Sequence, residues 1–252
     1  MLNTIISGHK SDQPALLIAH GLHGSARNWG VIAKRLASDR QTIAVDMRNH
    51  GKSDWFPTHN YSDMAGDLAE VIRHVGAPMD VLGHSMGGKA AMALALMFPE
   101  LVRRLIVADI SPVAYGHSHL QLTQVMGALD LSQVATRGDA DRLLSGDIDN
   151  PAVRAFLLQS LDIKEKRWRL NLDVLGAEME KIVGFPRFET SFSGPTFFVA
   201  GRDSDYIRTE HRPETKRLFP SARFAKIPGA GHWLHADKPR EFEAAVSAFL
   251  GF

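Results

Sequence analysis

Short apolar runs alternate with helical stripes along this chain, and this alternation restricts its fold more than any other feature. The runs are rich in Val and Ile, as buried parallel strands are. They cover residues 15–21, 42–46, 79–84, 104–110 and 196–203, with a weaker run at 222–228. Apolar residues repeat at helical spacing in 29–37, 64–75 and 242–250. We therefore predict an α/β fold, a mostly parallel sheet with helices on both faces.

One segment breaks the alternation. From about Pro112 to Gly194 no convincing buried strand is seen, and the segment is too long for a loop. It holds three helical patches, HLQLTQVMGAL, PAVRAFLLQSL and RWRLNLDVLGAEMEKIV. We expect residues 1–111 and 194–252 to form an α/β core domain. We expect residues 112–193 to form a helical lid over the carboxyl ends of the strands, where ligands bind in such sheets.

Composition narrows the possible functions. The 252 residues carry a net charge of +1, which gives no electrostatic reason to expect nucleic acid or an anionic membrane as a partner. The absence of cysteine excludes disulfides, thiolate metal sites and a cysteine nucleophile. The amino terminus shows no signal-peptide pattern, and no apolar run reaches the length of a membrane helix. We expect a cytoplasmic protein without membrane insertion; the oligomeric state is not indicated.

The pentapeptide Gly83-His84-Ser85-Met86-Gly87 matches the pattern G-x-S-x-G between a predicted strand and a predicted helix. In this pattern a serine sits on a sharp strand-to-helix turn, and the glycines allow strand and helix to approach each other. The amino terminus of the helix favours negative charge beside the serine. A chance match is the alternative, but the strand–turn–helix context favours Ser85 as a nucleophile.

A serine hydroxyl attacks only when a neighbouring base takes its proton. His232 follows the last predicted strand in the glycine-rich loop PGAGHWLHAD, and we interpret it as that base; His235 is the less suitable candidate. An early strand ends in His20-Gly21, so the next amide, that of Leu22, is placed to form an oxyanion hole with the amide of Met86. The alternative for the early loop is a purely structural turn.

These elements follow one another as in the α/β-hydrolases: HG after an early strand, G-x-S-x-G in mid-chain and GAGHW near the end. The chain resembles that family over nearly its whole length. Four longer phrases, DMRNHGKSD, GHSMGGKA, VADISPV and AGHWLHADKP, resemble a narrower branch of small serine esterases that includes bacterial members and a mitochondrial relative. The resemblance implies a small-molecule substrate, a short-chain acyl ester or acyl thioester.

The resemblance leaves the acid of the triad open. Most of the family places an aspartate three residues beyond a glycine after the late strand; counted from Gly201, that position is Ser204, with Asp203 and Asp205 on either side. The resembling branch uses the aspartate of VADISP, which is Asp109 at the end of the strand after the serine strand. We favour Asp109, then Asp205, then Asp203. The structural alternatives are a strand-end cap for the first and a solvated turn for the other two.

Weaker signals concern metals, anions and the acyl pocket. The histidine pairs 20/23, 117/119 and 232/235 lack a convincing carboxylate pattern, so we predict no metal site. The basic run KEKRWR at 164–169 is typical of a solvated helix face; the alternative is a site for an anionic group such as a coenzyme A phosphate. Candidates for an acyl pocket in the lid are Met126, Phe156, Leu157 and Trp168.

Taken together, the residues predict a cofactor-free serine carboxylesterase. Ser85 attacks an ester or thioester carbonyl, His232 acts as general base, and the lid sets the preferred chain length. A C–C bond hydrolase or a cofactor-free haloperoxidase would use the same triad and is the alternative among enzymes. The alternative from another class is a non-catalytic, hydrolase-like binding module, which typically lacks the serine or the histidine that this chain keeps.

Overall fold

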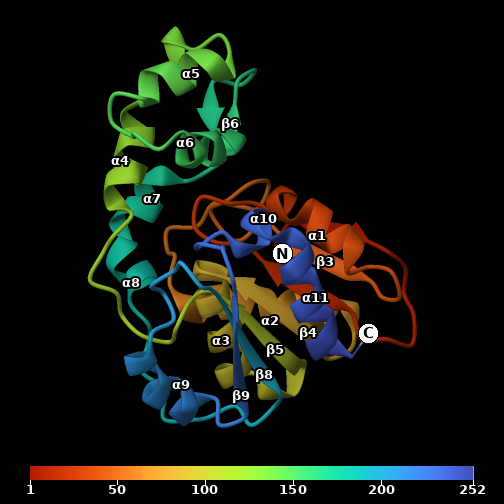
Figure 1. The fold of residues 1–252 in the computed structure, drawn as a ribbon. Coiled ribbons are helices and arrows are strands. Elements are labelled where there is room, and N and C mark those ends of the chain that lie inside the picture. The colour runs from red at the N-terminus through yellow and green to blue at the C-terminus, as the bar shows by residue number, and fades with distance from the viewer. Residues whose placement is uncertain (252) are drawn as a thin grey trace.

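A seven-stranded sheet lies at the centre of the molecule (Figure 1). The computed structural model describes residues 1–251, and its strand order is β1-β3-β2-β4-β5-β8-β9. The strands are β1 Thr4–Ser7, β2 Leu16–Ala19, β3 Thr42–Val45, β4 Met79–His84, β5 Val102–Ala108, β8 Thr196–Gly201 and β9 Ala222–Ile227. Neighbours from β3 to β9 run parallel, and β1 pairs antiparallel with β3 at one edge. The predicted mostly parallel sheet is confirmed.

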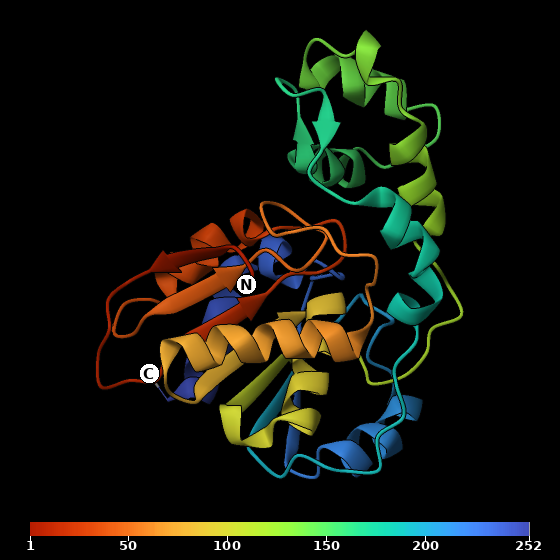
Figure 2. The ribbon, with the colours of Figure 1, turned by 180° about the vertical axis from the view of Figure 1, so that it is seen from behind.

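Helices cover both faces of this sheet. They are α1 Gly30–Arg35, α2 Tyr61–Val75, α3 Met86–Met97, α9 Arg212–Leu218, α10 Leu234–Asp237 and α11 Pro239–Leu250. Because side chains alternate along a strand, Leu16 and Ile18 of β2 belong to one core cluster with residues of α1 and α11. Leu17 and Ala19 belong to the opposite cluster, with residues of α2 and α3. Figure 2 shows α2 lying along the face turned to the viewer.

The chain between β5 and β8 forms a helical lobe, residues 120–183, that stands beyond one end of the sheet (Figure 1). Its elements are α4 Leu120–Ala128, α5 Arg137–Leu144, α6 Pro151–Leu157, β6 Leu161–Asp162, β7 Arg167–Trp168, α7 Leu172–Ala177 and α8 Met179–Val183. Short 3₁₀ helices are Ala26–Trp29, Pro99–Leu101, Leu131–Gln133, Leu158–Ser160 and Thr209–His211. Within residues 1–251, no helix is long and apolar enough to cross a bilayer.

The prediction of a helix over the basic run 164–169 is wrong. Lys166 adopts a left-handed φ of 47°, and the run turns the chain between β6 and β7. Leu161 pairs with Trp168 in this two-stranded sheet, and the Trp168 indole N–H donates a 2.8 Å hydrogen bond to the carbonyl of Met126. The tryptophan is therefore an anchor inside the lobe, and it holds the run as a hairpin rather than as a helix face.

The strand register brings two of the expected site residues together. His84 of β4 lies beside Ala108 of β5, and Ala108 lies beside Val199 of β8. Ser85 and Asp109 are the next residues of their strands, so both emerge at the same carboxyl edge. The helical lobe also meets this edge, where Ser160 Oγ donates a 2.9 Å hydrogen bond to the carbonyl of His23.

Buried histidines are packed beneath this edge. The ring centroids of His20 and His50 are 5.0 Å apart, and those of His50 and His59 are 5.3 Å apart. Burial lowers the pKa of His23, His59 and His84 to about 3 each. These imidazoles are neutral in the folded protein near pH 7, whereas an unfolded chain protonates them near pH 6.5. Proton uptake is therefore coupled to unfolding.

We predict that the free energy of unfolding falls as the pH is lowered below 6.5, since the unfolded chain then binds protons that the folded chain accepts only near pH 3. Between pH 5.5 and 4.5 the three histidines should together lower it by about 4 kcal/mol, at about 1.4 kcal/mol per group and pH unit. Urea unfolding at several pH values measures this. In His59→Gln one proton fewer is bound on unfolding, so the free energy of unfolding should fall less steeply, by about 1.4 kcal/mol per pH unit. A free energy of unfolding that stays constant from pH 7.5 to 5 would contradict the prediction.

Candidate active site

Ser85 lies on the sharp turn between β4 and α3. Its backbone is left-handed, with φ 52° and ψ −120°, a strained conformation for a residue with a side chain. Strand and helix nearly touch at this point. A Cβ on Gly83 would lie 2.2 Å from the carbonyl oxygen of Gly87, and a Cβ on Gly87 would lie 2.4 Å from that of Ala19. The turn therefore requires its glycines, and it presents the serine hydroxyl at the carboxyl edge of the sheet.

His232 faces this serine from the loop between β9 and α10. Its Nε2 is 3.0 Å from Ser85 Oγ, and its Nδ1 is 2.7 Å from Asp109 Oδ2. The carboxylate is an acceptor, so Nδ1 carries the proton and Nε2 is free to accept one from the serine. His84 Nε2 donates a 2.8 Å hydrogen bond to the His232 carbonyl and holds the loop against the serine turn.

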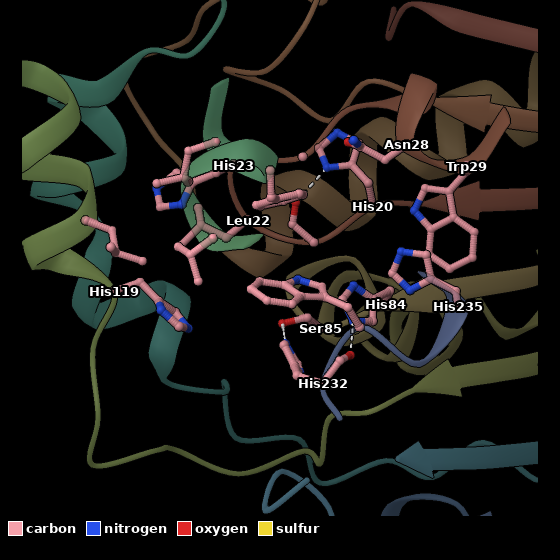
Figure 3. Close-up of a pocket in the computed structure, with 17 residues that line it drawn as sticks. His20, Leu22, His23, Asn28, Trp29, His84, Ser85, His119, His232 and His235 are labelled. Carbon is pink, nitrogen blue, oxygen red and sulfur yellow. Dashed lines mark hydrogen bonds between the residues drawn. The ribbon is translucent and has the colours of Figure 1, made fainter. Parts of the chain in front are cut away.

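The other candidate base, His235, lies elsewhere in the same loop region. Its ring stacks on that of Trp29, with centroids 4.2 Å apart and planes 11° apart. Figure 3 shows His235 beside Trp29, while His232 is joined to Ser85. The structure thus brings His232, and not His235, to the serine hydroxyl.

Asp109 is fully buried directly after β5, again with a left-handed φ of 52°. Its Oδ1 accepts a 3.0 Å hydrogen bond from the Gly201 amide. Its Oδ2 accepts hydrogen bonds from His232 Nδ1 and from the Ser204 hydroxyl. Three donors from two segments of the chain, the end of β8 with its following loop and the His232 loop, therefore converge on one carboxylate and orient it toward the imidazole.

The other two acid candidates lie outside this cluster. The Asp205 side chain is 92% exposed, with a carboxylate oxygen 4.0 Å from Arg208, and Asp203 is exposed as well. Ser204 stands between them, and its contact with Asp109 was not part of the sequence prediction. Its position three residues after Gly201 was the available signal, because that is where most of the family carries the acid.

Burial shifts both members of the acid–base pair toward their neutral forms. Burial raises the pKa of Asp109 to about 7, although the Ser204 hydroxyl and a backbone amide lower it. Burial lowers the pKa of His232 to about 3, and the neighbouring His119 and His117 lower it further. The two groups share a hydrogen bond and titrate as a unit. A neutral imidazole near pH 7 is the form that accepts a proton from the serine.

The loop after β2 packs against the serine turn. A Cβ on Gly21 would lie 3.0 Å from His84 Nδ1 and 3.3 Å from Ser85 Cβ, so a side chain here would fit only if the serine turn moved by a few tenths of an ångström. His20 fixes the loop from behind, because its Nδ1 lies 2.7 Å from the Gly21 carbonyl and its Nε2 accepts a 3.0 Å hydrogen bond from the Met47 amide.

Leu22, Ser85 and Met86 line one hollow together, and an oxyanion hole formed by the Leu22 and Met86 amides stays a prediction. Leu22 lines both hollows that border Ser85. Met86 is the first residue of α3, and the first amides of a helix have no acceptor within the helix. The loop after β2 and the first turn of α3 therefore both border the hollow beside the serine hydroxyl.

The larger hollow has a volume of about 140 Å³ and lies between the core and the helical lobe (Figure 3). Ser85 and His232 line it together with Trp29 and Trp233 of the core. The lobe contributes Leu122, Val153, Phe156 and Leu157. Phe156 and Leu157 thus face the hollow as expected, whereas Met126 and Trp168 are buried inside the lobe. A mostly apolar hollow with the serine hydroxyl at one side suits an acyl chain. In the described residues 1–251, no three His, Asp or Glu side chains are grouped to hold a metal ion.

Several known proteins are similar to this chain. A family model described as alpha/beta hydrolase fold matches residues 14–239. The sn-1-specific diacylglycerol lipase ABHD11 of Mus musculus is 41% identical over 248 residues, which cover 94% of this chain and 81% of that protein. Esterase YbfF of Escherichia coli K12 is 36% identical, covering 93% and 92%. A solved structure named Marine microorganism esterase has a TM-score of 0.93 and 37% identity, with 98% of both chains covered.

Replacing Ser204 by alanine should raise the pKa of Asp109, because the serine hydroxyl lowers it. The ionised carboxylate would then be lost at higher pH. We expect labelling of Ser85 by a fluorophosphonate to slow about twofold at pH 7, with its acid limb displaced upward by about half a pH unit. Labelling rates across pH 5 to 9 measure both. Ser221→Ala, which removes an exposed hydroxyl bonded to the Ser193 carbonyl, is the matched control; an acid limb that coincides with wild type would refute the role of Ser204.

Proposed function

The chain belongs to the alpha/beta hydrolase fold family, and on that basis we propose that it is a serine hydrolase that cleaves carboxylic esters. The observation that carries the proposal is the continuous line of hydrogen bonds from Ser85 through His232 to Asp109. Relatives named esterase and lipase support the ester bond as the target.

In the first half of the reaction, Ser85 Oγ attacks the ester carbonyl carbon while His232 Nε2 takes the hydroxyl proton. The carbonyl oxygen becomes an oxyanion, which accepts hydrogen bonds from the amides of Leu22 and Met86. Asp109 keeps the proton on Nδ1 and stabilises the imidazolium. The intermediate then collapses: the ester C–O bond breaks, and His232 gives its proton to the departing alcohol.

In the second half, water attacks the acyl-enzyme at the same carbonyl carbon. His232 takes a proton from this water, and the same two amides hold the second oxyanion. The bond to Ser85 Oγ breaks, the serine regains its proton from His232, and the free carboxylic acid leaves. Every proton moves between oxygen and one imidazole nitrogen, so the cycle uses no cofactor.

Residues 112–193 act in this proposal as a lid that selects the acyl chain. The hollow of about 140 Å³ and its aromatic wall, where the Phe156 and Trp233 ring centroids are 5.6 Å apart, favour short acyl groups. An acyl thioester presents the same carbonyl carbon to Ser85, so short-chain thioesters belong to the proposed substrate range.

The test compares hydrolysis of p-nitrophenyl esters from acetate to octanoate by wild type and single variants. Ser85→Ala should lower kcat by about 10⁴-fold or more, and Asp109→Asn by about 10³-fold to 10⁴-fold, since the first removes the nucleophile and the second the orienting charge. Asp205→Asn and Asp203→Asn are matched controls and should stay within about twofold of wild type. A large loss of kcat in Asp205→Asn would instead show that the acid of the triad follows the late strand β8.

A wild type that labels with fluorophosphonate but turns over no ester would contradict the esterase proposal and favour C–C bond hydrolysis by the same triad. Absence of labelling would instead favour a binding module. The melting temperature of the wild type separates both outcomes from a folding defect.

The lid proposal predicts a change of chain-length preference in Phe156→Ala. Removing this ring enlarges the hollow, so kcat/KM should rise about threefold or more for octanoate relative to butyrate, because additional methylenes are then buried. The exposed Leu143 of α5 provides the control variant Leu143→Ala. An unchanged ratio of the two esters would show that the acyl chain lies elsewhere.

A further inference from the structure

One face of the His232 ring is covered by a tyrosine that the mechanism above does not use. The Tyr206 ring lies parallel to the imidazole, with centroids 3.9 Å apart and planes 21° apart. On another side His84 lies with its ring centroid 4.8 Å from that of His232. The imidazole thus packs against two rings, while its nitrogens make the hydrogen bonds to Ser85 and Asp109.

Tyr206 is itself held at both ends. Its hydroxyl lies 2.9 Å from His117 Nε2 and 3.1 Å from His119 Nε2, on the segment that leads into α4. A hydroxyl has one proton, so it donates to one of these imidazoles and accepts from the other. Its carbonyl accepts hydrogen bonds from the hydroxyls of Tyr115, at 2.6 Å, and Ser111, at 3.1 Å. The ring therefore stays on His232 unless several hydrogen bonds break.

The proposed reaction requires a positive charge on His232, and burial of this ring disfavours that charge. Burial lowers the pKa of His232 to about 3, yet His232 must become an imidazolium when Ser85 gives up its proton. The titratable groups around the ring are Asp109, His84, Ser85, Tyr206, His117, His119, His235 and Asp237. Burial lowers the pKa of His84 to about 3, so that neighbour stays neutral and adds no repulsion near pH 7.

An aromatic face attracts a cation that lies within about 6 Å of its centroid, and the attraction grows where water is excluded. The Tyr206 face meets this condition for the His232 ring. The attraction is weak while the imidazole is neutral and strengthens when it is protonated. It therefore stabilises the transition state more than the ground state, which is the condition for raising kcat.

We propose that Tyr206 is a positioning residue for His232: its ring fixes the plane of the imidazole between Ser85 and Asp109 and stabilises the imidazolium that forms during the attack. Its hydroxyl, bonded to His117 and His119, keeps the ring in place from the entrance of the helical lobe. This inference rests on the proposed function for its kinetic consequences, and the labelling reaction of Ser85 tests it independently of any ester.

The experiment compares Tyr206→Leu with Tyr206→Phe. The leucine loses the aromatic face, and we expect kcat for p-nitrophenyl acetate to fall about tenfold to thirtyfold with KM within about twofold of wild type. Fluorophosphonate labelling should slow by the same factor, because it too needs His232 as base. The phenylalanine keeps the face, and both rates should stay within about threefold of wild type.

Two further variants keep the test decisive. Tyr206→Met replaces the leucine variant if that one does not fold, as judged by its melting temperature. Phe224→Leu removes a ring of β9 that stacks on Phe198, with centroids 5.4 Å apart, and should leave kcat and labelling unchanged.

Two results would overturn the proposal. One is a Tyr206→Leu or Tyr206→Met enzyme with wild-type kcat and labelling rate. The other is a Tyr206→Phe enzyme as slow as Tyr206→Leu, because the hydroxyl and not the ring face would then be responsible. If wild type labels but hydrolyses no ester, the proposed function fails, and the labelling rates of the Leu and Phe variants still decide the role of the tyrosine.

Discussion

Two strained residues at the ends of neighbouring strands determine the geometry of the whole site. Ser85 and Asp109 each adopt a left-handed backbone, at a cost on the order of 1–3 kcal/mol per residue. The sheet offsets this cost. The Ser85 amide donates to the Ala108 carbonyl, and the Asp109 amide donates to the Val199 carbonyl, so the ladder continues up to the residue that leaves it. The Ser85 hydroxyl and the Asp109 carboxylate therefore both lie at the carboxyl edge of the sheet, close enough for the single imidazole of His232 to hydrogen-bond to both.

The surroundings of this bridge are built largely from buried imidazoles. His20, His50 and His59 lie behind the loop that carries Gly21, and His84 lies beside His232. Burial holds these rings neutral, so they donate and accept hydrogen bonds at the edge of the sheet without placing positive charge beside the base. The same burial makes an imidazolium costly. Three donors orient the carboxylate partner, and two of them, the Ser204 hydroxyl and the Gly201 amide, lower its pKa against the effect of burial.

Periodicity and local motifs were sufficient to predict most of the sheet and the serine turn. The apolar runs contain β2, β3, β4, β8 and β9 and most of β5, and the G-x-S-x-G pattern located the turn that carries Ser85. β1 was missed because its four residues, none of them fully buried at this edge, show neither a long apolar run nor clear alternation. The β6–β7 hairpin was missed because its two-residue strands depend on the contact of Trp168 with the lobe interior. Asp109 came from resemblance, since spacing alone left three aspartates open.

Contacts between distant segments explain the remainder. Ser204 is 95 residues from Asp109 and Tyr206 is 89 residues from His117, and these contacts form only when β5 and β8 are paired side by side. That pairing also accounts for the choice of acid. Because the ends of β5 and β8 are adjacent, a carboxylate on either strand can reach the same imidazole nitrogen. Here Asp109 supplies the carboxylate, and Ser204, at the position where most of the family carries the acid, supplies a hydrogen bond to it. The ends of two neighbouring strands thus meet at one carboxylate: β5 leads into Asp109, and the loop after β8 supplies the hydroxyl that hydrogen-bonds to it.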